Sequence, residues 1–309
     1  MVMFFLLGLL AVWAKSDLSI PEAVAKFLAL YLLLSIGFRG GAEVSHHGLT
    51  WPLLGAVAAG VALSFATPFL AYFLLRRFTS LGTTDAAAVA GHYGSISAVT
   101  FAAVTGILGQ MSVPYDGYLV AVAAAMETPS IFAALLIANR QKNADAAPHN
   151  FLREVAFNNS IFILLGSFAI GAITGERGLT ILKPFILDLF AGFLCLFLLD
   201  MGLVAGRGLR QGWRYLSIPV TSFAVCMPLI GASLAALISV VLGLSVGSTA
   251  VMITLAASAS YIAVPAAMRL ALPAANPAIA LTLSLGVTFP FNLLFGIPLY
   301  IAIANRIAH

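Results

Sequence analysis

Long apolar runs follow one another along the whole chain and leave little room for charge. Charged residues make up 8% of the 309 residues, against roughly a quarter in a soluble domain. The runs are continuous rather than alternating, which excludes an outer-membrane barrel and predicts transmembrane helices of about 20 residues each. The sequence therefore predicts an all-α integral membrane protein without a sizeable soluble domain.

Ten transmembrane helices are expected, separated by proline, glycine or charged residues. They cover residues 1–14, 22–38, 50–75, 85–110, 115–138, 155–174, 184–205, 214–241, 247–271 and 276–304. A polar linker, 141–150, separates a first five-helix repeat at 1–140 from a second at 151–309. Because five is an odd number, the second repeat must cross the membrane in the opposite direction, so we expect two inverted five-helix repeats.

Short matches between the two halves support this repeat. The pattern Ser-x-Ser occurs at 95–97 and again 163 residues later at 258–260. Pro129 has a counterpart 161 residues later at Pro290. Two glycine pairs, 37-xxx-41 and 202-xxx-206, also correspond, and we interpret them as surfaces for close helix packing rather than as binding loops.

Two of the ten spans are interrupted near their middle by small residues. A backbone that is broken at membrane depth must be buried in protein or line a polar cavity. Each half-helix that resumes offers free N–H groups and the positive end of its dipole, which together form a site for a small monoanion. The alternative is that small residues only permit close packing. The residues concerned are Gly94, Ser95, Ser97, Ala257, Ser258 and Ser260.

A carboxylate lies near the middle of the fifth span, at Glu127. It costs about 2.5–3.5 kcal/mol to insert there, so it should face the protein interior and have a partner. Pro129 frees the carbonyl of Ala125, and the hydroxyls of Thr128 and Ser130 lie nearby in sequence. Hard cations favour such oxygen ligands, so we expect a Na⁺ site. A proton relay and a structural hydrogen bond are the alternatives.

Other polar residues lie in the spans that the repeat relates to these segments. The tenth span offers hydroxyls, an amide and the carbonyl freed by Pro290, but no acid. Candidate sodium ligands are therefore also Thr100, Ser284, Thr288 and Asn292. Candidates for supporting positions are Asp85, His92 and Tyr93. His92 either handles a substrate proton or is a hydrogen-bonded strut, and Asp85 is alternatively an acid in a first helical turn.

The basic residues predict the orientation. With the amino terminus outside, eleven of the fifteen Lys and Arg residues fall on cytoplasmic segments, as the positive-inside rule requires. Both termini are then outside and the linker 141–150 is cytoplasmic. Basic residues spread over loops do not indicate nucleic-acid binding, and no nucleophile–base arrangement indicates an enzyme or a cofactor. The residues alone favour a cation-coupled symporter of a small monoanion, with an anion channel or an anion-binding membrane sensor as the alternative class.

Three motifs resemble a known family. They are G-H-Y-G-S-I-S-A-V-T-F at 91–101, M-E-T-P-S-I at 126–131, and I-P-E-A-V-A-K-F-L at 20–28 leading to I-G-F-R-G-G at 36–41. With them the chain resembles the sodium-dependent bicarbonate transporter family of cyanobacteria and other bacteria. The resemblance implies a core domain with crossing, broken fourth and ninth helices, a gate domain, and a homotrimer in the bacterial inner membrane. It also implies sodium-coupled bicarbonate symport into the cell by alternating access.

The resemblance also implies particular site residues and a partner. The bicarbonate site would comprise Gly94, Ser95, Ile96, Ser97, Ala98, Ala257, Ser258, Ala259, Ser260 and Tyr261. Na⁺ would be the coupling ion, bound close by. Cyanobacterial members have a longer central loop and a PII-like nucleotide-binding regulator on the cytoplasmic face, whereas the loop at 141–150 is short in this chain.

Overall fold

The computed structural model describes residues 2–47, 51–139, 159–262, 264–265, 267–268 and 272–308. Within these ranges all regular elements are helical and there is no strand. Seven helical segments are long and apolar enough to cross a membrane, and Val2–Trp13 and Val246–Ala256 are shorter apolar helices. The predicted all-helical membrane fold is confirmed. The linker 141–150 lies outside the described residues.

The described helices divide between the two halves of the chain. The first half contains α1 (Val2–Trp13), α2 (Glu22–His47), α3 (Trp51–Phe78), α4 (Thr83–Gly94), α5 (Ala98–Gln110), α6 (Leu119–Ala125) and α7 (Pro129–Asn139). The second half contains α9 (Asn159–Lys183), η1 (Pro184–Asp188), α10 (Phe190–Gly212), η2 (Trp213–Tyr215), α11 (Ile218–Leu242), α12 (Val246–Ala256), α14 (Pro277–Leu281), η3 (Thr282–Thr288), α15 (Phe289–Phe291), η4 (Asn292–Gly296) and α16 (Ile297–Ile307).

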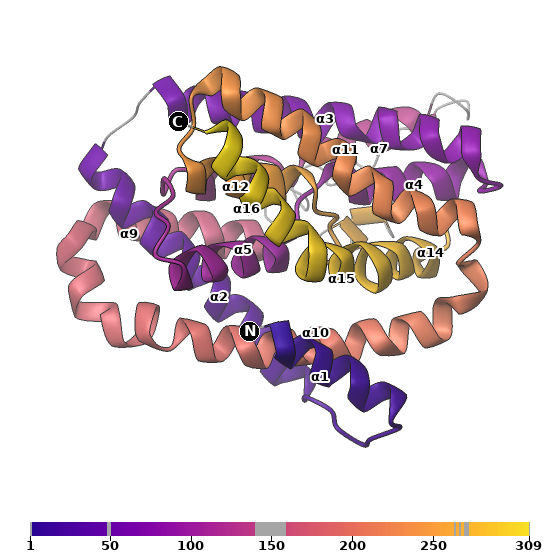
Figure 1. Ribbon diagram of the computed structural model, residues 1–309, viewed down its shortest axis with the longest axis horizontal. Coiled ribbons are helices and arrows are strands. Elements are labelled where there is room, and N and C mark those ends of the chain that lie inside the picture. The colour runs from indigo at the N-terminus through magenta and orange to yellow at the C-terminus, as the bar shows by residue number, and fades with distance from the viewer. Residues whose placement is uncertain are drawn as a thin grey trace.

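The helices α9 and α10 belong to one continuous apolar run that doubles back. The run covers Phe162–Tyr215, 54 residues, which is more than twice the length needed for one crossing. Gly175 has a positive φ of 58° inside α9, and a π-helical turn follows at Pro184–Asp188. The chain reverses its direction between α9 and α10 (Figure 1), so this run is long enough for two crossings.

Glycines let two pairs of helices pack backbone against backbone. A Cβ atom at Gly37 would lie 2.5 Å from the carbonyl oxygen of Leu164 on α9, and one at Gly41 would collide with the carbonyl of Phe168. In the same way, a Cβ atom at Gly202 of α10 would collide with the carbonyl of Phe5 on α1. Small residues at such spacing are typical of close contacts between transmembrane helices. The prediction that both glycine pairs are packing surfaces is confirmed.

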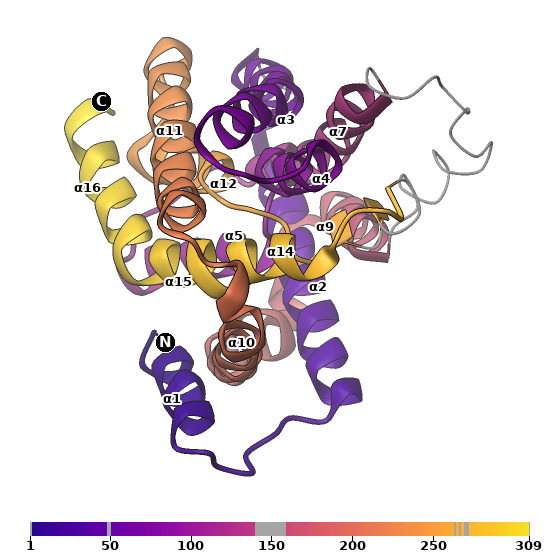
Figure 2. The same ribbon diagram turned by 90° about the vertical axis from the view of Figure 1, so that its right-hand side faces the viewer.

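The helices form two groups around the segment that contains the first break. Figure 2 shows α1, α2, α9 and α10 on one side, and α3, α4, α7, α11, α12 and α16 on the other. In the most apolar part of Thr83–Gln110, which contains α4 and α5, 94% of the window is buried inside the protein. The corresponding share for α11 is 33%. The fourth predicted span is therefore shielded by other helices, and α11 leaves most of its surface outside the protein core.

Candidate functional site

Two spans are interrupted where the sequence predicts it. The helix α4 ends at Gly94 and α5 begins at Ala98, with extended backbone at Ser95 (φ −96°, ψ 157°) and Ser97 (φ −104°, ψ 113°). In the second half α12 ends at Ala256, and residues 257–260 are not helical. The predicted interruption of both spans is confirmed.

The two interruptions contact each other directly. The backbone N–H of Ser97 donates to Oγ of Ser258 at 2.9 Å. The backbone N–H of Ser260 donates to the carbonyl of His92 at 2.8 Å, and Nδ1 of His92 lies 2.7 Å from the carbonyl of Ser260. Segments about 160 residues apart in the chain therefore share backbone hydrogen bonds deep inside the protein.

Serine hydroxyls accept backbone hydrogen bonds just after each break. Oγ of Ser97 accepts a hydrogen bond from the N–H of Thr100 at the start of α5, at 3.2 Å. Oγ of Ser260 accepts from the N–H of Val264 at 3.4 Å. The Ser97 cap satisfies only one of the free N–H groups at its helix start. The remaining main-chain dipole at the start of α5 still favours negative charge, and no side-chain cation is needed for that.

The predicted bicarbonate residues are enclosed by protein. All ten of them, 94–98 and 257–261, are buried except Ala98, which is half-buried. Gly94 is needed for this closeness, because a Cβ atom there would collide with Pro68 of α3 and lie 2.8 Å from Cβ of Ser130. The hydroxyl of Tyr261 is buried without a hydrogen-bond partner in the described structure.

One cavity of about 230 Å³ reaches the start of α5. Ala98, Val99 and Ala102 of α5 form one wall together with Ile262, which follows the second break. Lys26 and four neighbouring residues of α2 contribute to the lining from another side. The break is therefore approached through the contact between α5 and the helix group that contains α2.

The fifth predicted span is also interrupted, and its sequence does not predict this. The helix α6 ends at Ala125 and α7 begins at Pro129, whose missing N–H suits the first position of a helix. In the turn between them Glu127 is 5% exposed, and its Oε2 atom has no hydrogen-bond partner among the described residues. Its carbonyl accepts from Oγ of Ser95 at 3.2 Å and of Ser130 at 3.5 Å. An unsatisfied buried carboxyl group thus lies in a turn bonded to the first break.

Two predicted sodium ligands of the tenth span are fully engaged elsewhere. Oγ1 of Thr288 donates to the carbonyl of Ala224 at 2.7 Å and lies 2.7 Å from the hydroxyl of Tyr93. Nδ2 of Asn292 donates to the carbonyl of Ala257 at 2.8 Å, and its Oδ1 accepts from the hydroxyl of Tyr300 at 2.8 Å. Thr288 and Asn292 therefore support the two broken spans, one through Tyr93 and one through Ala257.

The remaining candidates lie in different places. Ser284 donates to Ala280 within its own helical segment, and Thr128 is half-buried in the turn of the fifth span. Thr100 is buried in the first turn of α5. Asp85 lies at the start of α4, nine residues before Gly94 and thus ~14 Å along the helix, where its Oδ1 accepts from the N–H of Asn276.

The contacts of His92 are those of a strut. Its side chain is 2% exposed, and both its Nδ1 atom and its carbonyl bond to the backbone of Ser260. Since the Ser260 carbonyl can only accept, Nδ1 carries the hydrogen. The imidazole therefore joins the end of α4 to the second break.

The hydrogen-bonded pair of Ser248 and Asp116 was missed from the sequence. Oγ of Ser248, near the start of α12, accepts from the N–H of Asp116 at 2.9 Å and donates to Oδ2 of Asp116 at 2.6 Å. This arrangement matches that of Asp85, near the start of α4, with the N–H of Asn276. A signal existed, because Asp85 and Ser248 are separated by 163 residues, the offset of the two Ser-x-Ser patterns.

The chain matches one protein-family model over residues 1–305, described as the Na+-dependent bicarbonate transporter superfamily. The chain belongs to this superfamily. The match includes both breaks, Glu127 and both ends of the core, so the resemblance noted from the three motifs is confirmed. The curated proteins compared with the chain include no match. Membership of a transporter superfamily and a membrane-helical fold point to a protein that is not an enzyme.

Proposed function

We propose that this protein is a secondary transporter that carries bicarbonate into the cell together with Na⁺ by alternating access. The observation that carries the proposal is the hydrogen bond between the Ser97 N–H and Ser258 Oγ, which joins two broken spans in a member of this superfamily. Broken helices that meet inside a membrane protein are typical of the substrate sites of secondary transporters. The bacterial inner membrane is the proposed location.

The proposed architecture is ten transmembrane helices in two inverted repeats. Two pairs of contacts support it, because each has a counterpart in the other half. The glycine contacts of α2 with α9 correspond to those of α10 with α1, and the Asp85–Asn276 bond corresponds to the Ser248–Asp116 bond. In this proposal α1, α2, α9 and α10 form the gate and the other helices form the core.

The assembly and its orientation are further parts of the proposal. We expect a homotrimer in the lipid bilayer with both termini outside and the linker 141–150 in the cytoplasm. A PII-like regulator would bind on that cytoplasmic face.

The bicarbonate site is proposed at the two breaks. The start of α5 offers main-chain N–H groups and a helix dipole, and most of the ten proposed site residues are small and none of them is charged. Such a cradle suits a compact planar anion with a single charge. The unpartnered hydroxyl of Tyr261 supplies one further donor that an anion can use.

The coupling ion is proposed beside Glu127. An ionised carboxyl group buried without a partner is strongly unfavourable, and Oε2 of Glu127 is in that position. Na⁺ removes this cost and places a positive charge next to the break that receives the anion, because Ser95 bonds to the carbonyl of Glu127. Each ion then makes the binding of the other more favourable, which is the basis of coupling.

The test is uptake of labelled bicarbonate into proteoliposomes that contain the purified protein. With a Na⁺ gradient directed inward, we expect bicarbonate to accumulate above its equilibrium level, and we expect no accumulation when K⁺ replaces Na⁺. Purely downhill flux would indicate a channel, and binding without flux would indicate a sensor. Stronger uptake of acetate or nitrate under the same gradient would identify a symporter of another small monoanion.

A further inference from the structure

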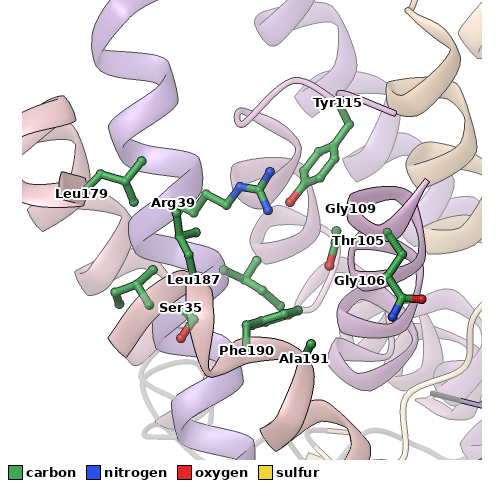
Figure 3. A pocket seen from close by; sticks show the side chains of 13 residues that line it. Ser35, Arg39, Thr105, Gly106, Gly109, Tyr115, Leu179, Leu187, Phe190 and Ala191 are labelled. Carbon is green, nitrogen blue, oxygen red and sulfur yellow. The ribbon is translucent and has the colours of Figure 1, made fainter. Parts of the chain in front are cut away.

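A second cavity lies away from the breaks, between α2, the end of α5 and the reversal from α9 to α10. Its volume is about 510 Å³. Figure 3 shows Arg39 and Ser35 on one side and Thr105, Gly106 and Gly109 on the other, with Leu187 and Phe190 between them. Thr105 lies eight residues after Ser97, so the nearer wall of the cavity begins ~12 Å along α5 from the first break. The cavity is thus a separate compartment on the path along α5.

Arg39 gives this cavity its charge. It is the one charged residue among the described residues that line the cavity. Its guanidinium lies 5.7 Å from the ring centroid of Tyr115, and none of the carboxylates whose side chains the structure describes forms an ion pair with it. Of two acids near the lining, Asp188 pairs with Lys183 at 2.6 Å, and Asp116 accepts a hydrogen bond from Ser248 and forms no ion pair with Arg39. The positive charge is therefore available to a ligand.

Ser35 adds a free hydrogen-bonding group. Its side chain is 2% exposed, and its Oγ atom has no hydrogen-bond partner within the described structure. It lies four residues before Arg39 on α2, so both side chains lie on one face of the helix. Most of the remaining wall is apolar or glycine. A cavity with low-dielectric walls concentrates the field of a single charge and raises the local concentration of ions of opposite sign.

We propose that this cavity is a second anion site, in which Arg39 and the Ser35 hydroxyl hold a small monovalent anion before it reaches the breaks. The inference rests on the proposed function for the identity of the anion as bicarbonate. Chloride from the medium has the same charge and could occupy the same site. The cavity thereby raises the rate of anion binding at low anion concentration, while the site at the two breaks determines which anion is transported.

The site can be tested without transport by a cysteine at its rim. Gln110 lines the cavity and is exposed, so Gln110→Cys in a background without Cys195 and Cys226 supplies a single thiol. We expect an anionic methanethiosulfonate to react about tenfold faster than a cationic one, and Arg39→Gln to remove this preference. Arg306→Gln, which removes an exposed arginine of α16, should leave it unchanged. Equal rates for the two reagents would overturn the proposal, as would a preference that survives Arg39→Gln.

Three further labelling measurements make the test of the cavity independent of whether Arg39→Gln folds. If Arg39→Gln does not fold, Arg39→Lys should retain the preference, and 1 M salt should abolish it in the protein that keeps Arg39, because the Debye length falls to about 3 Å. Slower labelling in bicarbonate than in chloride at equal ionic strength identifies the transported anion as the occupant, and the reverse identifies chloride. Labelling that neither anion slows would show that the cavity attracts reagents without holding an anion.

The transport assay separates this inference from the proposed function. In proteoliposomes we expect Arg39→Gln to raise the bicarbonate KM about tenfold and to leave kcat unchanged, with Arg39→Lys close to the parent protein. A loss of kcat at unchanged KM would indicate a structural role for Arg39 and contradict the second site. If the parent protein itself takes up no bicarbonate, the proposed function fails, while the thiol measurement still decides whether the cavity binds anions.

Discussion

The turns that support the two breaks have different chemistry. Beside the first break, Glu127 is buried with one oxygen unpartnered. In the corresponding segment of the second half, Thr288 and Asn292 are buried and each bonds to a backbone carbonyl. A buried neutral group with its hydrogen bonds made is inexpensive, whereas a buried unpaired charge is not. The turn at Glu127 therefore needs a cation or a proton, whereas the segment with Thr288 and Asn292 is complete as it stands.

Prolines inside α3 and α11 each leave one backbone carbonyl without its usual helical donor. Pro228 inside α11 cannot donate to the carbonyl of Ala224, and the Thr288 hydroxyl donates to that carbonyl instead. Pro68 inside α3 likewise cannot donate to the carbonyl of Ser64. Glu127 precedes Pro129 by two residues, as Thr288 precedes Pro290. An ionised carboxylate has no hydrogen to donate, so the first half requires either a cation or a proton where the second half uses a hydroxyl.

Glu127→Gln should produce the largest change, because it makes the first turn neutral like the second. Loss of a buried charge partner is worth about 3 kcal/mol, so the Na⁺ concentration for half-maximal uptake should rise about a hundredfold. Without Na⁺, the variant should melt at a higher temperature than the parent protein, since it no longer buries an unpaired carboxylate. Unaltered Na⁺ dependence in Glu127→Gln would mean that the ion does not bind in this turn. Uptake by the parent protein that is driven by a pH gradient alone would instead assign Glu127 to a proton relay.

Thr288→Val tests the opposite half of the comparison. The substitution keeps the branched shape and removes the hydroxyl that Ala224 and Tyr93 share. We expect the free energy of unfolding in detergent to fall by about 1–3 kcal/mol, the cost of leaving buried polar groups unpaired. The Na⁺ dependence of uptake should not change. A variant with normal stability and weakened Na⁺ dependence would mean that the ion binds in the second half as well.

Ser258→Ala and Ser95→Ala compare the breaks themselves. Ser258 fixes the N–H of Ser97 at 2.9 Å, whereas Ser95 makes a longer bond of 3.2 Å to the carbonyl of Glu127. One such bond is worth about 1 kcal/mol, so we expect Ser258→Ala to raise the bicarbonate KM about five- to tenfold and Ser95→Ala to raise it less. The measurement is uptake against bicarbonate concentration at saturating Na⁺. An unchanged KM in both variants would separate the anion site from the breaks.

Features with local sequence signals were predicted correctly. Glycine and serine inside an apolar run predicted the breaks at 95–97 and 257–260, and the glycine pairs predicted close packing of α2 and α10. The buried position of Glu127 followed from the cost of a charge in a membrane. These features depend on a few neighbouring residues, so one sequence is enough to find them.

Features that depend on distant pairing were not predicted. The bond between Asp85 and Asn276 joins residues 191 positions apart, and nothing local to either residue indicates it. The interruption of the fifth span was also missed, because Pro129 is equally compatible with a kinked continuous helix. The cavity at Arg39 was not predicted either, since it forms from segments far apart in the chain.

The smallest effects are expected at the two ends of the core, where the halves again differ in charge. Asp85→Ala and Ser248→Ala each remove an acceptor for one backbone N–H, so each should lower the free energy of unfolding by about 1 kcal/mol without altering the bicarbonate or Na⁺ dependence. Asp85→Ala removes a charge that is partly exposed, so its effect should weaken in high salt. Ser248→Ala removes a neutral hydroxyl that also donates to the Asp116 carboxylate, so its effect should depend less on salt. Thermal unfolding at low and high ionic strength measures this. A salt effect of equal size in both variants would show that the two ends are equivalent, and that the asymmetry of charge between the halves is confined to Glu127.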